Sequence, residues 1–455
     1  MTSAASHSHL EHTSPLKKAR IAAWGAFSGQ AMEYYDFNLY ATSAALVFGT
    51  VFFPSENAAA GTMLAFATFA VGFLVRPLGG VIFGHLGDKF GRKSTLIATL
   101  LIMGIATTLI GVLPGYATAG IMAPVLLITL RVIQGIALGG EWGGASLVAL
   151  EHAPIEKRAF YGSIPQLGSP AGLLLSTTAL LLVGLLPNDQ FLSWGWRLPF
   201  LFSGVLLIVA LLIRTRVEET PDFRASHDPA QKRRPPIVEV FRSSPRALLF
   251  GIMAVLISTG GYYLINTFTT SYVTTELGLD RSVALTAQVI NAVVQGAVLL
   301  FVGVLGTKRS PRRIVGISAL LMAGWAFPLY GLMQIGAPAA IYAGLIVATI
   351  IQTGIWALLP ALLSSQFPVH VRYTGISLVF QGGSSIGGFL PLIATALLTA
   401  ASGNPWALAG LLAVVALITA VGALGLRGEW DDAKDGAAHN GTGTATASEA
   451  VGVGD

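Results

Sequence analysis

The feature that most limits how this chain can fold is a series of long apolar stretches. An α-helix needs about 20 residues to cross the roughly 30 Å hydrocarbon core of a membrane, and stretches of about this length recur from Ile21 to Leu426. Backbone polar groups cannot stay unpaired in lipid, and stretches this long exclude the short alternating strands of a β-barrel. We therefore expect an all-α membrane protein with twelve transmembrane helices, at residues 21–52, 61–83, 94–113, 120–149, 160–186, 196–213, 247–275, 283–306, 314–335, 337–362, 373–399 and 405–426.

The composition agrees with a lipid environment. Charged residues make up only 11% of the chain and hydrophobic residues 53%, so the apolar surface exceeds what an aqueous core could bury. The chain has no cysteine, which excludes disulfides, thiolate catalysis, zinc–thiolate sites and iron–sulfur clusters. His7, His9 and His12 belong to an expected solvated tail rather than to a metal site. We predict neither a cofactor nor a bound metal.

The positions of the basic residues predict the orientation in the membrane. All but four of the 27 Lys and Arg residues fall on one side of the predicted spans. Arg197 and Arg281 fall on the other side, and Arg76 and Arg131 lie within spans. The positive-inside rule makes the first side cytoplasmic, together with both termini. The net charge of +5 is spread over short clusters between spans, which indicates a lipid bilayer and not a nucleic acid as the partner.

A repeat in the loops predicts two related halves. Pro154 precedes Arg158 by four residues after the fourth span, and Pro368 precedes Arg372 by four residues after the tenth. We predict a cytoplasmic tail (1–20), a six-helix bundle (21–213), a cytoplasmic linker (214–246), a second six-helix bundle (247–426) and a disordered tail (427–455). A substrate cavity is expected between the bundles, near the middle of the membrane.

The segment GHLGDKFGRK, residues 84–93, is the most specific string in the chain. Its glycines permit a tight turn, Asp88 can cap a helix start, and Arg92 can pair with a carboxylate such as Glu151. The string resembles the signature between spans two and three of the major facilitator superfamily; an ordinary basic turn is the alternative. Thr307 and Ser365 stand at the matching places of the second half, so we expect the first-half latch to dominate the outward-open state. The predicted latch residues are Gly84, Asp88, Gly91, Arg92, Glu151 and Arg158.

Five charged residues are predicted inside spans, all of them in the first half: Glu33, Asp36, Arg76, Arg131 and Glu141. A charge in lipid is costly, so each one is a functional candidate. Glu33 and Asp36 share a helix face, and two close carboxylates beside Arg131 would load and release a proton near neutral pH. No histidine lies in a predicted span, so we predict proton coupling by Glu33, Asp36, Arg131 and Glu141. A permanent ion pair between the first and fourth spans is the alternative.

Arg76 has no acid partner within its own helix, so we predict that it binds a substrate carboxylate. A snorkelling or capping arginine is the alternative. The other predicted substrate-binding residues are polar or aromatic side chains of the spans: Tyr35, Tyr40, Gln134, Trp142, Tyr262, Tyr263, Asn266, Gln288, Asn291 and Gln381. Interhelical hydrogen bonds for the amides and interfacial anchoring for the tyrosine pair are the alternatives.

Further strings resemble the metabolite:H+ symporter family within the major facilitators. They are EYYDF at 33–37, RPLGG at 76–80, GGEWGG at 139–144, WGWRLP at 194–199 and VRYTG at 371–375. The resemblance implies a bacterial inner-membrane symporter of shikimate, α-ketoglutarate, citrate, aromatic acids, proline or betaine. The first half is most similar to the shikimate-type members.

We therefore predict a proton-coupled symporter, functional as a monomer, that imports a small organic acid such as shikimate, a dicarboxylate or an aromatic acid by alternating access. A zwitterionic osmolyte such as proline or betaine is the first alternative. Two other classes fit less well. A membrane-embedded enzyme would need a motif such as HExxH or a Walker loop, which the chain lacks, and a permanent pore does not need two asymmetric bundles with a latch.

Overall fold

The computed structural model of the chain describes residues 15–54, 58–226, 235–269 and 272–428. This described part consists of helices and connecting turns and contains no strand. The first half holds α1 (Pro15–Ser43), η1 (Ala44–Phe48), α2 (Gly49–Phe52), α3 (Ala58–Leu74), α4 (Arg76–Phe90), α5 (Arg92–Ile110), α6 (Tyr116–Ala119), α7 (Met122–Glu151), η2 (Ile155–Lys157), α8 (Arg158–Ser163), η3 (Ile164–Leu167), α9 (Gly168–Val183), α10 (Asn188–Gln190), η4 (Phe191–Gly195) and α11 (Arg197–Thr215). The linker holds α12 (Pro221–Ser226) and α13 (Pro236–Ser243). The second half holds α14 (Pro245–Leu256), η5 (Ile257–Gly261), η6 (Tyr263–Phe268), η7 (Tyr272–Glu276), α16 (Arg281–Lys308), α17 (Pro311–Gln334), α18 (Pro338–Ser364), η8 (Val369–Val371), α19 (Arg372–Gly388), α20 (Leu390–Ala400) and α21 (Trp406–Gly425).

Eleven helical spans in the described part are long and apolar enough to cross a membrane. α1 is not among them although it has 29 residues, because three basic residues at its start and the two acids Glu33 and Asp36 lower its hydropathy. It packs along α9, α11 and α7 inside the first bundle and so completes that bundle. The all-α fold predicted from the sequence is confirmed.

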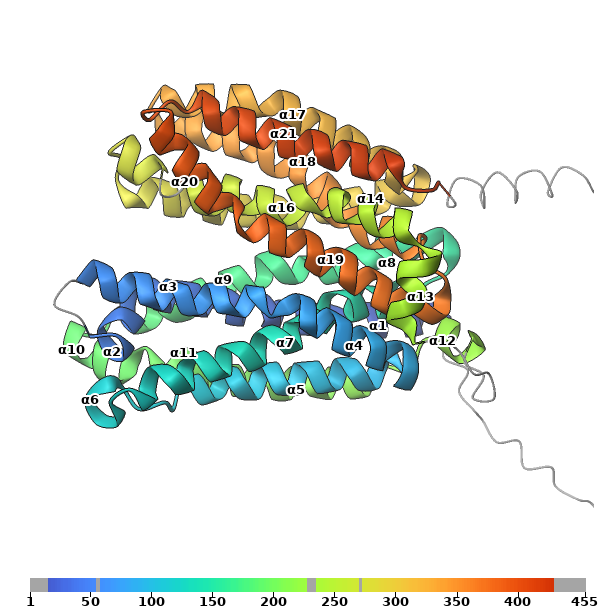
Figure 1. The fold of residues 1–455 in the computed structure, drawn as a ribbon, viewed down its shortest axis with the longest axis horizontal. Helices are drawn as coiled ribbons and strands as arrows, with labels where there is room; N and C mark the ends of the chain where they lie inside the picture. The colour runs from blue at the N-terminus through green and yellow to red at the C-terminus, as the bar shows by residue number, and fades with distance from the viewer. Residues whose placement is uncertain (1–14, 55–57, 227–234, 270–271, 429–455) are drawn as a thin grey trace, which may run out of the picture.

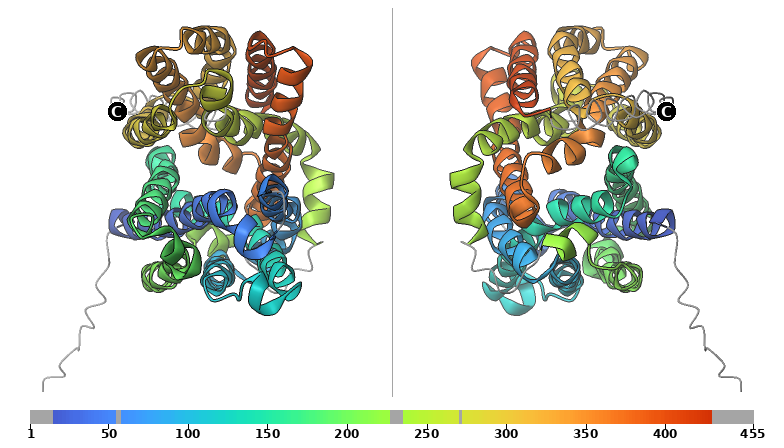
Figure 2. Two further views of the ribbon diagram at one scale, coloured as in Figure 1. Left: turned by 90° about the vertical axis from the view of Figure 1, so that its left-hand side faces the viewer. Right: turned by 90° about the vertical axis from the view of Figure 1, so that its right-hand side faces the viewer.

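The helices form two bundles that face each other along their length (Figure 1). Figure 2 shows the first bundle, blue to green, below the second bundle, yellow to red. The closest packing between them joins α4 and α7 of the first bundle to α19, and α8 to α16. Small residues make this approach possible: a Cβ on Gly84 of α4 would lie 2.9 Å from the Cα of Thr374 on α19.

The segments at residues 84–92, 151–158 and 365–372 lie together at one end of the molecule, which we call the latch end (Figure 1, right). The predicted loop repeat is visible in the backbone there. Pro154 (φ −53°, ψ 145°) and Pro368 (φ −54°, ψ 147°) have the same conformation, and each is followed by a short 3₁₀ turn and a helix that begins with an arginine. Both described chain ends lie at this end too, since Lys18 contacts Glu218 and Arg427 contacts Gln366.

The seventh span departs from regular α-helix. α14 ends at Leu256 and the chain continues through three π-helical turns, η5, η6 and η7. Such turns are uncommon and frequently occur at functional sites. Gly260 in η5 allows this segment to lie against Gly387 of α19, where an added Cβ would come within 2.9 Å of the Gly387 backbone. The irregular segment presents residues 258–263 to the space between the bundles.

Candidate functional site

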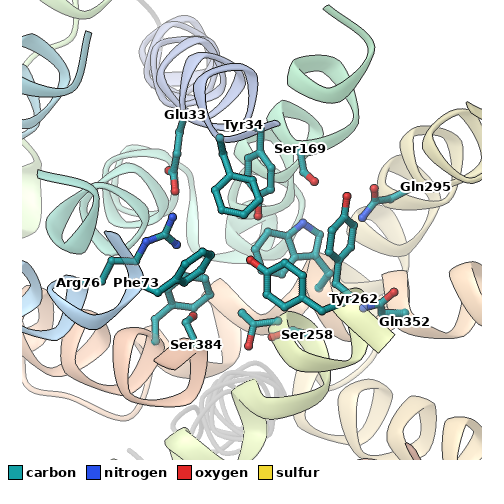
Figure 3. Close-up of a pocket in the computed structure, with 15 residues that line it drawn as sticks. Glu33, Tyr34, Phe73, Arg76, Ser169, Ser258, Tyr262, Gln295, Gln352 and Ser384 are labelled. Atoms are coloured by element: carbon teal, nitrogen blue, oxygen red, sulfur yellow. The ribbon is translucent and has the colours of Figure 1, made fainter. Parts of the chain in front are cut away.

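A pocket with an empty volume of about 700 Å³, which includes space open to solvent, lies between the two bundles. Figure 3 shows Glu33, Phe73 and Arg76 of the first bundle on one side, facing Tyr262, Gln295 and Gln352 of the second bundle. The lining combines one acid and one base with neutral polar and aromatic groups: Glu33, Tyr34, Phe37, Phe73, Arg76, Ser169, Ser258, Thr259, Tyr262, Tyr263, Gln295, Gln352, Trp356, Phe380 and Ser384.

Arg76 reaches the cavity from the break between α3 and α4. Pro77 follows it at the first turn of α4, where the missing N–H of a proline is tolerated. The guanidinium carbon lies 4.2 Å from the ring centre of Phe73 and 5.5 Å from that of Phe37. In the described part of the chain, Arg76 makes no ion pair, and its buried Nε has no hydrogen-bond partner. The cation is therefore held by aromatic faces and open to an anion.

Glu33 lines the same cavity and is only 8% exposed. Its Oε2 atom is buried and has no hydrogen-bond partner within the described part of the chain. No ion pair joins Glu33 to Arg76 among the described residues, although Figure 3 shows both on the same side of the cavity. An unpaired buried charge is unfavourable, so this acid and base are arranged for something other than stability.

Asp36 points away from the cavity, although the sequence predicts one shared site with Glu33 and Arg131. Residues three apart on a helix differ by about 60° in direction, and the cavity edge falls between these two carboxylates. Thr107 (2.7 Å) and Ser203 (2.8 Å) donate hydrogen bonds to Asp36. The structure thus separates the two acids.

Arg131, the predicted counterweight to the acids of the first span, is linked to Asp36 through other side chains and has no direct hydrogen bond to it among the described residues. Its guanidinium donates to Gln134 Oε1 (3.0 Å), and Gln134 Nε2 donates to Thr107 Oγ1 (2.6 Å), which in turn donates to Asp36. The guanidinium carbon also lies 3.9 Å from the ring centre of Tyr40. Two neutral side chains therefore link the base to the acid in a buried polar chain.

Glu141 is paired with Arg214, a base that the sequence places in the predicted linker. Arg214, in the last turn of α11, is only 4% exposed and forms an ion pair with Glu141. Its guanidinium also donates to the carbonyl oxygens of Gly25 (3.3 Å) and Leu96 (2.9 Å), and Thr99 donates to Glu141 (2.7 Å). In the part of the chain that the structure describes, Arg214 thus joins the five predicted charges as a sixth buried charge away from the latch, because neighbouring helices bury the polar end of α11.

Of the predicted substrate-binding residues, Arg76, Tyr262 and Tyr263 line the cavity. The others with described side chains do not line it: Tyr35, Tyr40, Gln134, Trp142, Gln288, Asn291 and Gln381. Tyr35 donates to the carbonyl oxygen of Pro199 at 2.8 Å within the first bundle. Trp142 lies behind the cavity wall, where its ring stacks on that of Phe380 with 3.8 Å between the ring centres. The side chain of Asn266 lies outside the described residues.

Gln381 acts between the bundles instead of lining the cavity. Its Nε2 donates to the carbonyl oxygens of Gly139 (3.1 Å) and Leu138 (3.4 Å) on α7. Tyr373, on the same helix α19, donates to the Gly140 carbonyl oxygen at 2.8 Å. These bonds close the cavity toward the latch end.

Asp88 joins the two bundles at the latch end. Its carboxylate accepts hydrogen bonds from the backbone N–H groups of Tyr373 (3.2 Å) and Thr374 (2.8 Å) at the start of α19. A carboxylate at a helix N-terminus is stabilised by the unpaired N–H groups and the helix dipole. Gly91, with φ of 107°, makes the turn from α4 into α5 that a residue with a Cβ would strain.

The predicted ion pair between Arg92 and Glu151 is present, and both side chains are buried. Glu151 also accepts a hydrogen bond from Arg372 of the second bundle at 2.9 Å. Arg92 donates to the carbonyl oxygen of Val369 at 3.1 Å, across the same interface. The predicted latch residues therefore hold the bundles together at this end, with the cavity on the far side of the contact.

Sequence reasoning missed most of the cavity wall. The wall includes Tyr34, Trp356, Phe380 and Ser384, whose residue types are common in membrane spans and carry no spacing signal. Residues 383–387 match the pattern GxSxG, but they lie inside α19 and not at the strand-to-helix turn that a hydrolase needs. The second-half residues become functional candidates only when the fold brings them opposite Arg76.

Two six-helix membrane bundles that enclose a polar cavity and close at one end define a solute transporter. The family model described as Major Facilitator Superfamily matches residues 26–390 and 252–450, and the chain belongs to this superfamily. The resemblance predicted from the sequence motifs is thereby confirmed, and the chain is a transporter with several membrane spans rather than an enzyme.

Named relatives agree with this family. The shikimate transporter of Escherichia coli (strain K12) is 42% identical over 421 residues, which cover 91% of this chain and 96% of the relative. The proline/betaine transporter of Salmonella typhimurium (strain LT2) is 34% identical over 420 residues, covering 89% of this chain and 83% of the relative. Among solved structures, the proton:xylose symporter XylE has the same fold, with a TM-score of 0.72 at 16% identity over 90% of this chain and 95% of that chain.

Proposed function

We propose that this transporter imports a small organic acid together with protons, by alternating access, across the cytoplasmic membrane of a bacterium. The latch end would face the cytoplasm, because most of the basic residues lie there. A monomer suffices, since one chain contains the whole cavity. The most similar relative named above, a shikimate transporter, supports an organic acid as the substrate.

One observation carries the proposal: Glu33 and Arg76 line the same cavity, and within the described chain they are not joined by an ion pair. A deprotonated Glu33 competes with a substrate carboxylate for the guanidinium of Arg76. A protonated Glu33 leaves that guanidinium to the substrate, because a neutral carboxyl group no longer neutralises it. Proton binding and anion binding then favour each other, so the proton and the substrate tend to occupy the cavity together.

The transport cycle follows from this coupling. With the latch closed, the cavity would receive a proton on Glu33 and an anion on Arg76 from the far side of the membrane. With Glu33 protonated, the bound anion neutralises Arg76 and the cavity has no net charge, whereas an anion bound beside an ionised Glu33 would leave a net negative charge that is costly to enclose in a low-dielectric environment. The bundles would then rock, the latch would open, and the substrate and proton would leave toward the cytoplasm.

The second bundle would recognise the uncharged part of the substrate. Ser384 and Trp356 both line the cavity and are only 3% and 4% exposed. Ser384 Oγ and Trp356 Nε1 have no hydrogen-bond partner among the residues that the structure describes. Gln352 Nε2 is used by the carbonyl oxygen of Ile257 (3.2 Å), which leaves its Oε1 as an acceptor. Such groups suit hydroxyl groups on a carboxylic acid, since buried donors and acceptors favour a ligand that satisfies them.

A zwitterion such as betaine is the second candidate. The rings of Tyr34, Trp356 and Phe380 line the cavity, and aromatic faces bind quaternary ammonium groups. The proline/betaine relative supports this candidate. Its carboxylate would still use Arg76, so the two candidates differ in what the second bundle recognises.

Uptake into proteoliposomes under an imposed pH gradient tests the proposal. The purified chain should accumulate shikimate or a related hydroxylated acid above its equilibrium level when the outside is acidic. Glu33→Gln should still exchange labelled for unlabelled substrate but lose accumulation, because the amide imitates the protonated state permanently. Gradient-driven accumulation by Glu33→Gln would refute the coupling, and uptake of betaine but of no acid would replace the substrate class.

A further inference from the structure

The linker between the bundles crosses the latch end and contacts both of them. We call its first part, residues 216–226, the linker strap; it contains the turn after α11 and the helix α12. Figure 1 shows α12 at the latch end, beside the ends of the two bundles. An interdomain linker needs no specific contacts to connect two domains, so the contacts of this strap call for an explanation.

The strap is fastened to the first bundle by side chains that cap α5. Glu219 accepts hydrogen bonds from the backbone N–H groups of Arg92 (3.1 Å) and Lys93 (3.2 Å). Gly91, the residue before α5, has no side chain that could supply this cap. Thr220 is fully buried and accepts a hydrogen bond from the Arg92 guanidinium at 3.2 Å. The start of α12 is therefore held in a fixed place beside the latch.

Asp222 of α12 bridges the two bundles from that place. It accepts hydrogen bonds from Arg158 of the first bundle (3.2 and 3.3 Å) and from Arg372 of the second bundle (3.2 Å). The side chains of Asp222 and Arg372 are 22% and 14% exposed, so the bridge is partly shielded from solvent. Arg372 thus binds two carboxylates, Glu151 and Asp222, and neither of them belongs to the second bundle.

The second half has no acid of its own for this purpose. At the positions that match Asp88 and Glu151, the second half has Thr307 and Ser365. The hydroxyl of Thr307 donates to the Val304 carbonyl oxygen (2.7 Å) and that of Ser365 to the Leu362 carbonyl oxygen (2.9 Å), each within its own helix. Glu151, the other carboxylate that pairs with Arg372, is shared with Arg92, and Asp222 adds a second carboxylate to Arg372.

We propose that the linker strap is a third component of the latch, in which Asp222 supplies the carboxylate that the second half lacks and so sets the balance between the closed and open latch. The charges explain the need. Arg92, Arg158 and Arg372 meet at this interface with the acids Asp88, Glu151 and Glu219, and Arg158 and Arg372, which would repel each other, both donate to Asp222. Asp222 reduces that repulsion only while the bundles are together, because Arg158 and Arg372 belong to different bundles.

The absence of cysteine from the chain makes a direct test possible. Lys89 at the end of α4 and Lys308 at the end of α16 are exposed at the latch end of the two bundles. Spin labels on Lys89→Cys and Lys308→Cys would report the distance between the bundles in full-length protein in lipid nanodiscs. The measurement needs neither substrate nor a proton gradient, so it can fail or succeed independently of the proposed function.

Asp222→Asn should raise the ratio of open to closed latch by about fivefold, which corresponds to about 1 kcal/mol. Asp222→Glu should restore most of the closed population, because it returns the carboxylate. Glu218→Gln is the matched control: this acid lies on the same strap, but its contacts with Lys18 (3.0 Å) and Arg224 (3.8 Å) do not involve the second bundle.

A distance distribution in Asp222→Asn identical to that of the unsubstituted protein would overturn the proposal. An equal shift in Glu218→Gln would overturn it too, since that would mean that any loss of charge loosens the strap. If Asp222→Asn folds poorly, its effect on the spin-label distance is measured in the background of Arg372→Gln instead. The proposal requires that Asp222→Asn change the distance less in this background, because Arg372 has already lost its charge.

Discussion

Replacing Asp88 by asparagine should shift the transporter from the closed latch toward the open one. The carboxylate accepts the N–H groups of Tyr373 at 3.2 Å and Thr374 at 2.8 Å, and the residue is 8% exposed. A hydrogen bond to a charged group contributes about 1.5–3 kcal/mol, and an asparagine of the same shape keeps only one of the two. The closed state should therefore lose about 2 kcal/mol, or about 30-fold in the ratio of closed to open forms.

Two measurements together check this prediction. The spin-label distance between positions 89 and 308 should lengthen in most molecules, and the initial rate of substrate uptake should fall several-fold. The amount of folded protein in the membrane should not change, because the bond exists only in one of two folded states. Asp189→Asn is the matched control, since Asp189 is an exposed acid in α10, outside the latch.

Unchanged uptake together with an unchanged distance would refute the reasoning, because it would mean that the N-terminus of α19 does not need the charge. Reduced uptake with a normal distance would refute it as well. In that case Asp88 would act on the substrate or proton and not on the equilibrium between the two states.

Other substitutions test separate parts of the site. Arg76→Ala should lower carboxylate uptake by about 10-fold to 100-fold, measured as initial rates in proteoliposomes, whereas normal uptake would exclude Arg76 as the anion site. Glu141→Gln should destabilise the first bundle by about 3–5 kcal/mol, because the buried Arg214 loses the carboxylate that it pairs with. Thermal unfolding in detergent should therefore show a lower Tm, and a second substitution that neutralises Arg214 should partly restore it. The hydrogen bond from Lys18 lowers the pKa of Glu218. The small contribution of this pair to stability should therefore be present at neutral pH and be lost as the pH falls through the lowered pKa. Unfolding measured at several pH values in low and high salt checks this prediction.

The fold was predictable from the sequence because the membrane leaves few choices. A long apolar stretch must be helical in lipid, and charge-rich loops identify where the helices end. The latch was predictable for a related reason: Asp88, Arg92 and Glu151 are charged residues at or near the ends of helices, where the sequence predicts short connections with few other partners. Even so, the N–H groups that Asp88 binds belong to another bundle, which no local pattern reveals.

The site was less predictable because it depends on the side of each helix that faces the cavity. Glu33 and Asp36 are three residues apart, yet only Glu33 lines the cavity. Arg214 was assigned to a loop, because hydropathy locates the end of a span only to within about one turn. The residue type of Trp142 suggests a place in the site, but its ring stacks on Phe380, behind the cavity wall.

The guanidinium of Arg214 ties four helices of the first bundle together, since it joins Glu141 of α7 to backbone oxygens of α1 and α5 from its own position on α11. Because these contacts join four helices, we expect the first bundle to move as one rigid body. If the bundles rock as proposed, we expect the deformation in the second bundle, where the seventh span already departs from regular α-helix in its π-helical turns. The division of charge between the halves would then also be a mechanical one, with a rigid first bundle that holds the buried charges and a more deformable second bundle that adapts to the substrate.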